Sequence, residues 1–539
     1  MESYPLLGNP VAMAGVLDYK GRPITKTSSG RWVAASFILA IEMAERVAYN
    51  GIVFNLISYM TGPLGESTVA AASAVSVWSG VTLLLPILGA LVADSFLSRY
   101  RTIVISSFLY VLGLGLLSLS AVLPNLTTFK SVLFYFSFYI VAIAEGGHRP
   151  CVQAFGADQF DETDESECKW RSSFFNWWIF GLAVALTASP IVLSYIQDNV
   201  NWALGFGIPC ILLGSALIVF LMGSRFYRCY TFKETSPYGQ VSRAFVNLVK
   251  RKLFSDAKSE AEALVKNYPV SPTQPKLQRG GEDLMTEQME LETKSLLHLF
   301  PIWATCLFYS IINCQWETFF TKQGATLDRN IISNFHIPAA GLQSLSNLSV
   351  TILIVFYDRL AVPLTRNITG IPSGITMLQR IGIGLLLSVF VMVISALVEM
   401  KRLETAIEFD LVDKPNSVLP MSILWLFPQY ILMGLSSVFA TVGLQEFFYD
   451  QVPDSLRSFG IAICLSIFGI GSLINSFLIY VTDKVTTRIG GESWFSNNLN
   501  RAHLDYFYWL IACMEFCSFV AFVHYGRCYV YKTRREIGV

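Results

Sequence analysis

The chain has 539 residues, of which 53% are hydrophobic, 14% aromatic and only 14% charged. Average soluble domains carry about 25% charged residues, so this composition excludes an ordinary soluble protein. The 39 basic and 39 acidic residues cancel, so the bulk charge indicates no partner of one sign, and no nucleic-acid partner is expected.

Apolar runs long enough to cross a bilayer, which takes roughly 20 helical residues, recur twelve times along the chain. They fall into two groups of six, at 32–60, 69–94, 102–124, 131–155, 173–196 and 202–223, and at 296–320, 339–361, 374–399, 419–448, 459–482 and 504–530. The pattern predicts an all-α membrane protein with two six-helix bundles, spanning 32–223 and 294–531. A polar linker at 224–293 would join them, with tails at 1–31 and 532–539.

The distribution of basic residues predicts the orientation. An even number of spans places both termini on one side, and 28 of the lysines and arginines fall on that side against nine on the other. Cytoplasmic segments carry the excess of Lys and Arg, so both tails and the linker are expected in the cytoplasm.

Three charged residues, Glu42, Glu45 and Arg46, interrupt the first apolar run. Charge inside hydrocarbon costs at least ~2.5–3.5 kcal/mol per group, so these side chains must pair or face a water-filled space. Spacings of three and four residues place all of them on one flank of a helix. One arginine can neutralise only one carboxylate, which makes the other a candidate proton carrier. A self-neutralised pair that only holds helices together is the alternative.

A second arginine lies inside the fourth run, within Glu145-Gly146-Gly147-His148-Arg149. Arginine stays protonated in proteins, so Arg149 must find a carboxylate, and Glu42 or Glu45 is the expected partner. His148 is interpreted as a helix-packing residue, with a pH sensor as the alternative.

Further charged residues occur in the second half and in the first loop. Glu317 in the seventh run and Glu446 in the tenth are expected to face the space between the bundles, and an ion pair with a base on the cytoplasmic side is the alternative for each. Asp94 and Arg99, after the second run, are candidates for a gating pair at a cytoplasmic helix end. No metalloprotease, hydrolase or phosphate-loop signature is present, so no enzyme activity, cofactor or metal site is expected.

Two short motifs concern the location of the protein. Glu2 with Leu6 and Leu7 fits the acidic dileucine sorting pattern, which a sorting adaptor could bind. Similar signals direct plant membrane proteins to the vacuole, so the vacuolar membrane is the expected location and the plasma membrane the alternative. Asn125-Leu126-Thr127 is a glycosylation sequon, whose use the sequence leaves open.

Several motifs together resemble the plant nitrate/peptide transporter family (NPF), the plant branch of the proton-dependent oligopeptide transporters, and most of all its fifth subfamily. They are Glu42-x-x-Glu45-Arg46, Gly89 with Asp94 and Arg99-Tyr100, Gly146-Gly147-His148-Arg149-Pro150-Cys151-Val152, Phe155-Gly-Ala-Asp-Gln-Phe-Asp161, Phe174-Phe-Asn-Trp-Trp178, Thr326-Leu-Asp-Arg329, Ile337-Pro338, Gly374-Ile-Thr-Met-Leu-Gln-Arg380-Ile-Gly382, and Trp494 through Tyr506. The matches run from the first span to the last.

The resemblance implies a major facilitator fold and proton-coupled symport of a small solute by alternating access. By position, Glu42, Glu45 and Arg46 would form the proton-coupling motif. Arg149 would be the basic residue of the fourth span, which pairs with that motif, and Glu446 the acid of the tenth span that helps to gate or couple.

For the substrate, the subfamily likeness favours nitrate. Asn313 occupies the position where a nitrate-binding member has a pocket histidine, which weakens this choice. Arg149 and Glu317 could instead hold the two ends of a di- or tripeptide, and a carboxylate-bearing plant hormone is a further alternative. Thr102 aligns with a threonine that is phosphorylated in one branch. A nutrient receptor that binds without transport is the alternative of a different class.

Overall fold

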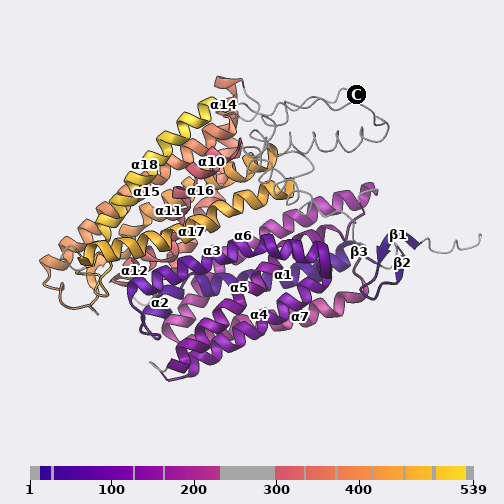
Figure 1. The fold of residues 1–539 in the computed structure, drawn as a ribbon, viewed down its shortest axis with the longest axis horizontal. Coiled ribbons are helices and arrows are strands. Elements are labelled where there is room, and N and C mark those ends of the chain that lie inside the picture. The colour runs from indigo at the N-terminus through magenta and orange to yellow at the C-terminus, as the bar shows by residue number, and fades with distance from the viewer. Residues whose placement is uncertain are drawn as a thin grey trace, which may run out of the picture.

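The computed structural model of the chain describes residues 12–25, 29–124, 128–161, 164–230, 298–332, 335–370, 374–415, 417–452, 457–488 and 493–529. The dileucine motif, the sequon, nearly all of the predicted linker and the C-terminal tail lie outside these residues. The helices form two bundles side by side, one from each half of the chain (Figure 1). The expected all-α architecture is therefore confirmed.

The first bundle is built from long helices with one short one. They are α1 (Arg31–Val53), α2 (Leu56–Thr61), α3 (Thr68–Val92), α4 (Arg99–Val122), α5 (Thr128–Ala157), α6 (Glu165–Asn199) and α7 (Trp202–Met222), with the short turns η1 (Ala93–Leu97) and η2 (Gly223–Arg225). Several starts have side-chain caps: Ser67, Asp164 and Asn201 each accept a hydrogen bond from a backbone N–H of the helix that follows.

The second bundle has more interruptions. Its helices are α10 (Phe300–Thr305), α11 (Leu307–Glu317), α12 (Phe319–Ala325), α13 (Gln343–Phe356), α14 (Val362–Thr369), α15 (Met377–Glu408), α16 (Phe427–Asp450), α17 (Arg457–Arg488) and α18 (Leu504–Cys528), with the turns η3 (Ala339–Leu342), η4 (Tyr357–Ala361) and η5 (Ile423–Leu426). A capping box formed by Thr376 and Gln379 starts α15.

Ten helical stretches in the described residues are long and apolar enough to cross a membrane. The other two predicted spans, the first and the seventh, do not meet this criterion, each for a physical reason. In α1, the charged residues Glu42, Glu45 and Arg46 lie near the middle of the helix. The seventh span, predicted as one run, is broken at Cys306 and again at Thr318 into α10, α11 and α12.

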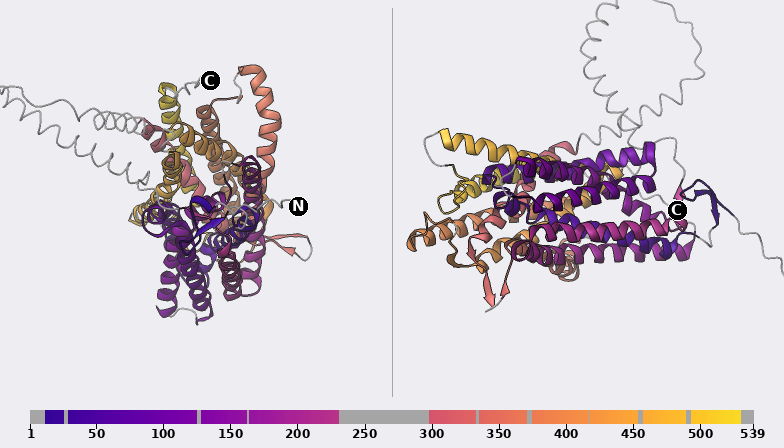
Figure 2. Two further views of the ribbon diagram at one scale, coloured as in Figure 1. Left: turned by 90° about the vertical axis from the view of Figure 1, so that its right-hand side faces the viewer. Right: turned by 90° about the horizontal axis from the view of Figure 1, so that it is seen from below.

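A small sheet closes one end of the first bundle, which we call the sheet end; the other is the far end. β1 (Ala12–Leu17) lies between β2 (Pro23–Thr25) and β3 (Cys229–Tyr230) and is antiparallel to both, with Leu17 opposite Pro23 and Cys229. The remaining strands are β4 (Leu327–Asp328), β5 (Asn330–Ile332), β6 (Phe335–His336) and β7 (Leu419–Ser422). The β5–β6 hairpin projects at the far end (Figure 2).

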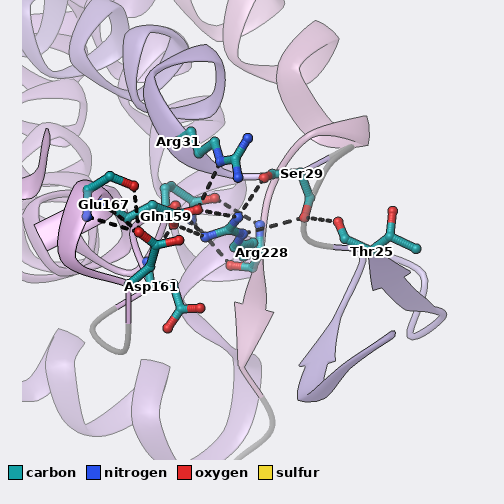
Figure 3. Close-up of polar contacts among 9 residues, drawn as sticks. Thr25, Ser29, Arg31, Gln159, Asp161, Glu167 and Arg228 are labelled. Carbon is teal, nitrogen blue, oxygen red and sulfur yellow. Dashed lines mark hydrogen bonds and ion pairs between the residues drawn. The ribbon is translucent and has the colours of Figure 1, made fainter. Parts of the chain in front are cut away.

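A buried ion-pair cluster lies beside the sheet, and we call it the Arg228 cluster (Figure 3). The Arg228 guanidinium is fully buried and donates to Glu167 at 2.7 Å, to the Gln159 carbonyl at 3.0 Å and to the Ser29 carbonyl at 2.9 Å. Arg31 donates to the other oxygen of Glu167 at 2.8 Å. The cluster thus joins the segment before α1, the end of α5, the start of α6 and the chain after α7.

The second bundle has a comparable buried pair toward its far end. Arg402 donates to Glu399 at 2.6 and 2.8 Å, to Asn500 at 2.9 Å and to the Leu499 carbonyl at 2.6 Å, and Gln323 donates to the same Glu399 at 2.8 Å. Both charged side chains are fully buried. These bonds tie α15 to α12 and to the loop before α18.

Polar contacts that join the two bundles occur in the half nearer the far end. Lys322 of α12 donates to Thr61 of α2 at 2.9 Å, and Arg329 lies 3.9 Å from Asp198 of α6. Deeper in the bundles, Asn475 of α17 donates to Ser76 of α3 at 2.9 Å. In this half of the molecule, the two bundles are therefore held together.

Candidate functional site

The charged residues of α1 share one buried site. The Arg46 Nε lies 2.8 Å from a carboxylate oxygen of Glu42 and 3.3 Å from one of Glu45. Both glutamates are fully buried, and Arg46 is 9% exposed. Tyr110 of α4 donates to Glu45 at 3.4 Å. One guanidinium is thus shared by two carboxylates, as the spacing of the three residues predicts.

A third buried carboxylate, Glu145 of α5, completes the site. Its Oε1 lies 3.8 Å from Nη1 of Arg46 and 3.5 Å from Nη1 of Arg149. The expected partnership of Arg149 with Glu42 or Glu45 is therefore wrong. Arg149 instead pairs within its own helix, because a spacing of four residues places Glu145 directly beside it. We call Glu42, Glu45, Arg46, Glu145 and Arg149 the charge cluster.

Close helix packing fixes the α5 side of this site. A Cβ added at Gly89 of α3 would lie 1.9 Å from the Gly146 carbonyl oxygen of α5, so the two helices touch through backbone at that level. Only glycine permits such an approach. Because Gly146 directly follows Glu145, the contact holds the α5 side of the charge cluster against the rest of the bundle.

His148, the neighbour of Arg149, is also fully buried, and neither ring nitrogen has a hydrogen-bond partner among the described residues. Ligand atoms of His148, Glu42 and Glu45 all lie within 4.8 Å of one another, a spacing that could hold a metal ion. The Arg46 guanidinium already lies against both carboxylates, however. A positive charge thus occupies the position that a metal would need.

Arg149 connects the charge cluster to the second bundle. Its side chain is 29% exposed, and its guanidinium carbon lies 5.9 Å from the centre of the Tyr49 ring. The Tyr49 hydroxyl lies 3.4 Å from that of Thr82. One turn before Thr82 on α3, Ser79 donates to Glu317 of α11 at 2.7 Å. The structure therefore places Arg149 inside the molecule, close to the point where the two bundles meet.

Two other residues of the second bundle that the sequence singled out, Asn313 and Glu446, have their polar partners outside the charge cluster. Asn313 of α11 donates to the Tyr309 carbonyl of its own helix at 3.0 Å. Glu446 of α16 is 42% exposed and lies 3.0 Å from Arg380 at the start of α15. For Glu446 this geometry is the ion pair that the sequence left open as the alternative.

The predicted gating residues lie at the sheet end. Arg99 donates to Asp158 at the end of α5 at 2.6 Å, a partner that was not predicted. The side chain of Asp94 lies outside what the structure describes. Thr102, one turn after Arg99 begins α4, is 4% exposed and donates to the Ser98 carbonyl, so a kinase could not reach it in this conformation.

Sequence reasoning missed Glu145, Tyr49 and Ser79. For Glu145 a signal was present, because it precedes Arg149 by four residues within an apolar run. For Tyr49 and Ser79 the sequence offers no comparable signal, since their roles depend on which helix faces are brought together by the fold.

The comparisons with known proteins agree over nearly the whole chain. Residues 100–495 match the sequence model of the POT family. Protein NRT1/PTR FAMILY 5.10 of Arabidopsis thaliana is 50% identical over 97% of this chain and 97% of its own length, and FAMILY 5.14 of the same plant is 48% identical over 96% of each.

Two solved structures show the same arrangement of helices. An auto-inhibited POT family peptide transporter superposes with a TM-score of 0.71 at 20% identity, covering 94% of this chain and 99% of that one. The POT family transporter PepTSo superposes with a TM-score of 0.71 at 19% identity, covering 92% and 98%.

Proposed function

Since this chain belongs to the POT family of proton-coupled transporters and to its NRT1/PTR branch, we propose that it carries nitrate together with protons across the vacuolar membrane. Membership confirms the family resemblance, the major facilitator fold and a transporter rather than an enzyme. The substrate, the location and the residue roles below are our proposal.

The observation that carries the proposal is the charge balance of the charge cluster. Three fully buried carboxylates face two arginines, which leaves one negative charge in excess. An unbalanced charge is costly in a dry interior, and binding one proton removes it. The cluster is thus suited to alternate between a protonated and a deprotonated state, which is the requirement for coupling.

Arg149 supplies the substrate side of the mechanism. Its Nη1 atom is buried, 3.5 Å from Glu145, while the side chain as a whole is 29% exposed. A nitrate anion could accept from the other N–H groups of the guanidinium. Asn313 and Glu317, on α11 of the facing bundle, would line the other side of the site. Closure of the bundles around the anion, followed by opening on the opposite side, completes transport.

The pairs at the sheet end would contribute to gating. Arg99 with Asp158, and Arg380 with Glu446, join neighbouring helices within one bundle at that end. Asp94 would act beside Arg99, as its position in the loop suggests. In the proposed orientation the sheet end is cytoplasmic, and these pairs would stiffen the helix ends that separate when the cytoplasmic side opens.

The proton gradient can drive such a carrier. Each pH unit across the membrane contributes ~1.36 kcal/mol for every proton carried down the gradient. At the vacuole, symport would run from the acidic lumen into the cytosol. The dileucine motif would direct the protein to the vacuolar membrane by binding a sorting adaptor through Glu2, Leu6 and Leu7.

A zwitterionic substrate is the second candidate, and a specific contact favours it. Glu317 and Arg149 lie on facing bundles with Tyr49 and Ser79 between them, so a di- or tripeptide could extend from one charge to the other. A nutrient receptor with this fold would bind the same solutes without accumulating them.

The test is uptake by the purified protein in liposomes with an imposed pH gradient, using nitrate, dipeptides and carboxylate hormones. Gradient-driven accumulation of nitrate is expected, and Glu45→Gln should abolish it. Glu165→Gln, at an exposed position at the start of α6, serves as the control and should behave as the wild type. Binding without accumulation would indicate a receptor. Full coupled uptake by Glu45→Gln would remove the mechanism.

A further inference from the structure

Glu145 is the least satisfied carboxylate of the charge cluster. It is fully buried, and no donor among the described residues makes a hydrogen bond to either of its oxygens. Its two arginine contacts are long, at 3.5 and 3.8 Å. Glu42, in contrast, receives a hydrogen bond of 2.8 Å from Arg46. Glu42 is therefore better satisfied by hydrogen bonding than Glu145.

The surroundings of Glu145 favour a shared proton. The carboxyl groups of Glu45 and Glu145, from α1 and α5, both lie against the Arg46 guanidinium, at 3.3 and 3.8 Å, and are therefore near each other. Two carboxylates this close cannot readily both be ionised, and one proton between them satisfies an oxygen of each. The charged and titratable side chains facing this pair are Glu42, Arg46 and Tyr49 from α1, Tyr110 from α4, and His148 and Arg149 from α5. Where α3 packs on α5, it presents Leu85 to Gly146.

Arg149 links this pair to the substrate. Of the two arginines near Glu145, Arg46 is divided among three carboxylates, whereas Arg149 contacts Glu145 alone among the described acidic residues. An anion bound at the exposed part of Arg149 would pair with the positive charge of its guanidinium. Glu145 would then lose its main counter-ion and would bind a proton more strongly.

We propose that Glu145 is the carboxyl group that takes up the coupled proton, shared with Glu45, and that an anion on Arg149 controls this uptake. In the step, one proton leaves water on the acidic side and forms an O–H bond on Glu145 as the anion binds Arg149. Both leave on the other side, so no net charge moves with a monovalent anion. This inference rests on the proposed function and assigns its proton site to a residue outside the α1 motif.

The direct test is proton uptake on anion binding by the detergent-purified protein in weak buffer, followed with a pH indicator dye and nitrate as the probe. The wild type should take up about one proton per nitrate bound, in line with the charge count of the cluster. Glu145→Gln should bind nitrate without proton uptake, and its affinity should no longer change between pH 5 and pH 7.5 as the wild type's does.

In liposomes, Glu145→Gln should lose accumulation driven by the pH gradient while retaining exchange of labelled for unlabelled nitrate. Glu145→Asp keeps a titratable group and should retain coupled accumulation. Glu515→Gln is the matched control, because Glu515 is equally buried but lies on α18, where Ser388 donates to it at 3.0 Å. It should stay coupled.

Proton uptake by folded Glu145→Gln equal to that of the wild type would overturn the inference. Loss of coupling in a folded Glu145→Asp would overturn it as well, because a carboxyl group would then be insufficient. The proposed function fails separately, when the wild type itself shows no gradient-driven accumulation of any solute tested.

Discussion

Glu167→Gln should destabilise the first bundle strongly, because Glu167 forms a 2.7 Å ion pair with Arg228 and both side chains are fully buried. Removing one partner of a buried ion pair costs about 3–5 kcal/mol, since the other charge stays buried without that counter-ion. Arg31 adds little to this cost, because its side chain is 37% exposed and can turn to water. At roughly 2–4 °C per kcal/mol, the melting temperature should fall by about 6–20 °C.

The assay is thermal unfolding of the detergent-solubilised protein, followed by the fluorescence of a thiol dye or by loss of a monodisperse peak. Lys169→Met is the matched control, because it breaks the exposed pair with Glu165, also on α6, whose two side chains are 74% and 89% exposed. Such a pair contributes little, so no clear shift is expected. The double variant Glu167→Gln with Arg228→Gln should recover part of the loss. Equal shifts for Glu167→Gln and Lys169→Met would refute the reasoning.

Two further predictions concern packing and thiol chemistry. Gly89→Ala should lower the thermal stability and abolish coupled uptake, because the new methyl group would meet the backbone of α5 at 1.9 Å. Gly115→Ala is the control, because the nearest atom there is 3.8 Å away and neither property should change. Equal effects of the two substitutions would contradict the close contact at Gly89. Burial, with Asp18 and Asp158 nearby, raises the pKa of the Cys229 thiol to about 12, so its thiolate is scarce at neutral pH. Alkylation of Cys229 by iodoacetamide should therefore rise steadily with pH above neutral. Mass spectrometry should find it far less modified at pH 7.5 than the exposed Cys528, and equal labelling would contradict the burial.

The parts of the site that depend on one helix were predictable from the sequence. Glu42, Glu45 and Arg46 converge because helical spacing alone places them together. The same rule applied to α5 would have paired Glu145 with Arg149, and the error came from assuming that the partner lay on another helix. The contact of Ser79 with Glu317 could not be foreseen, because it depends on how the two bundles meet.

The same division holds for the fold. Apolar runs located the spans but not the helix ends, since hydrophobicity marks the bilayer and a helix can continue in polar sequence beyond it. Thus α6 begins at Glu165, with Asp164 as its cap, although the apolar run begins at 173. Similarly, α15 continues to Glu408, past the predicted end at 399. The β1–β2 hairpin was missed because its strands are too short to show a clear alternation.

The small sheet and the Arg228 cluster have a practical consequence for observing the carrier at work. β1 is paired with β3, and the neighbouring Arg228 donates a hydrogen bond to the Ser29 carbonyl. The β1–β2 hairpin should therefore move together with the first bundle. A fluorophore on the exposed Lys20 would therefore report the position of that bundle, and a second one on Cys528 would report α18 of the other. Energy transfer between the two dyes would follow changes in the distance between the two bundles in single molecules.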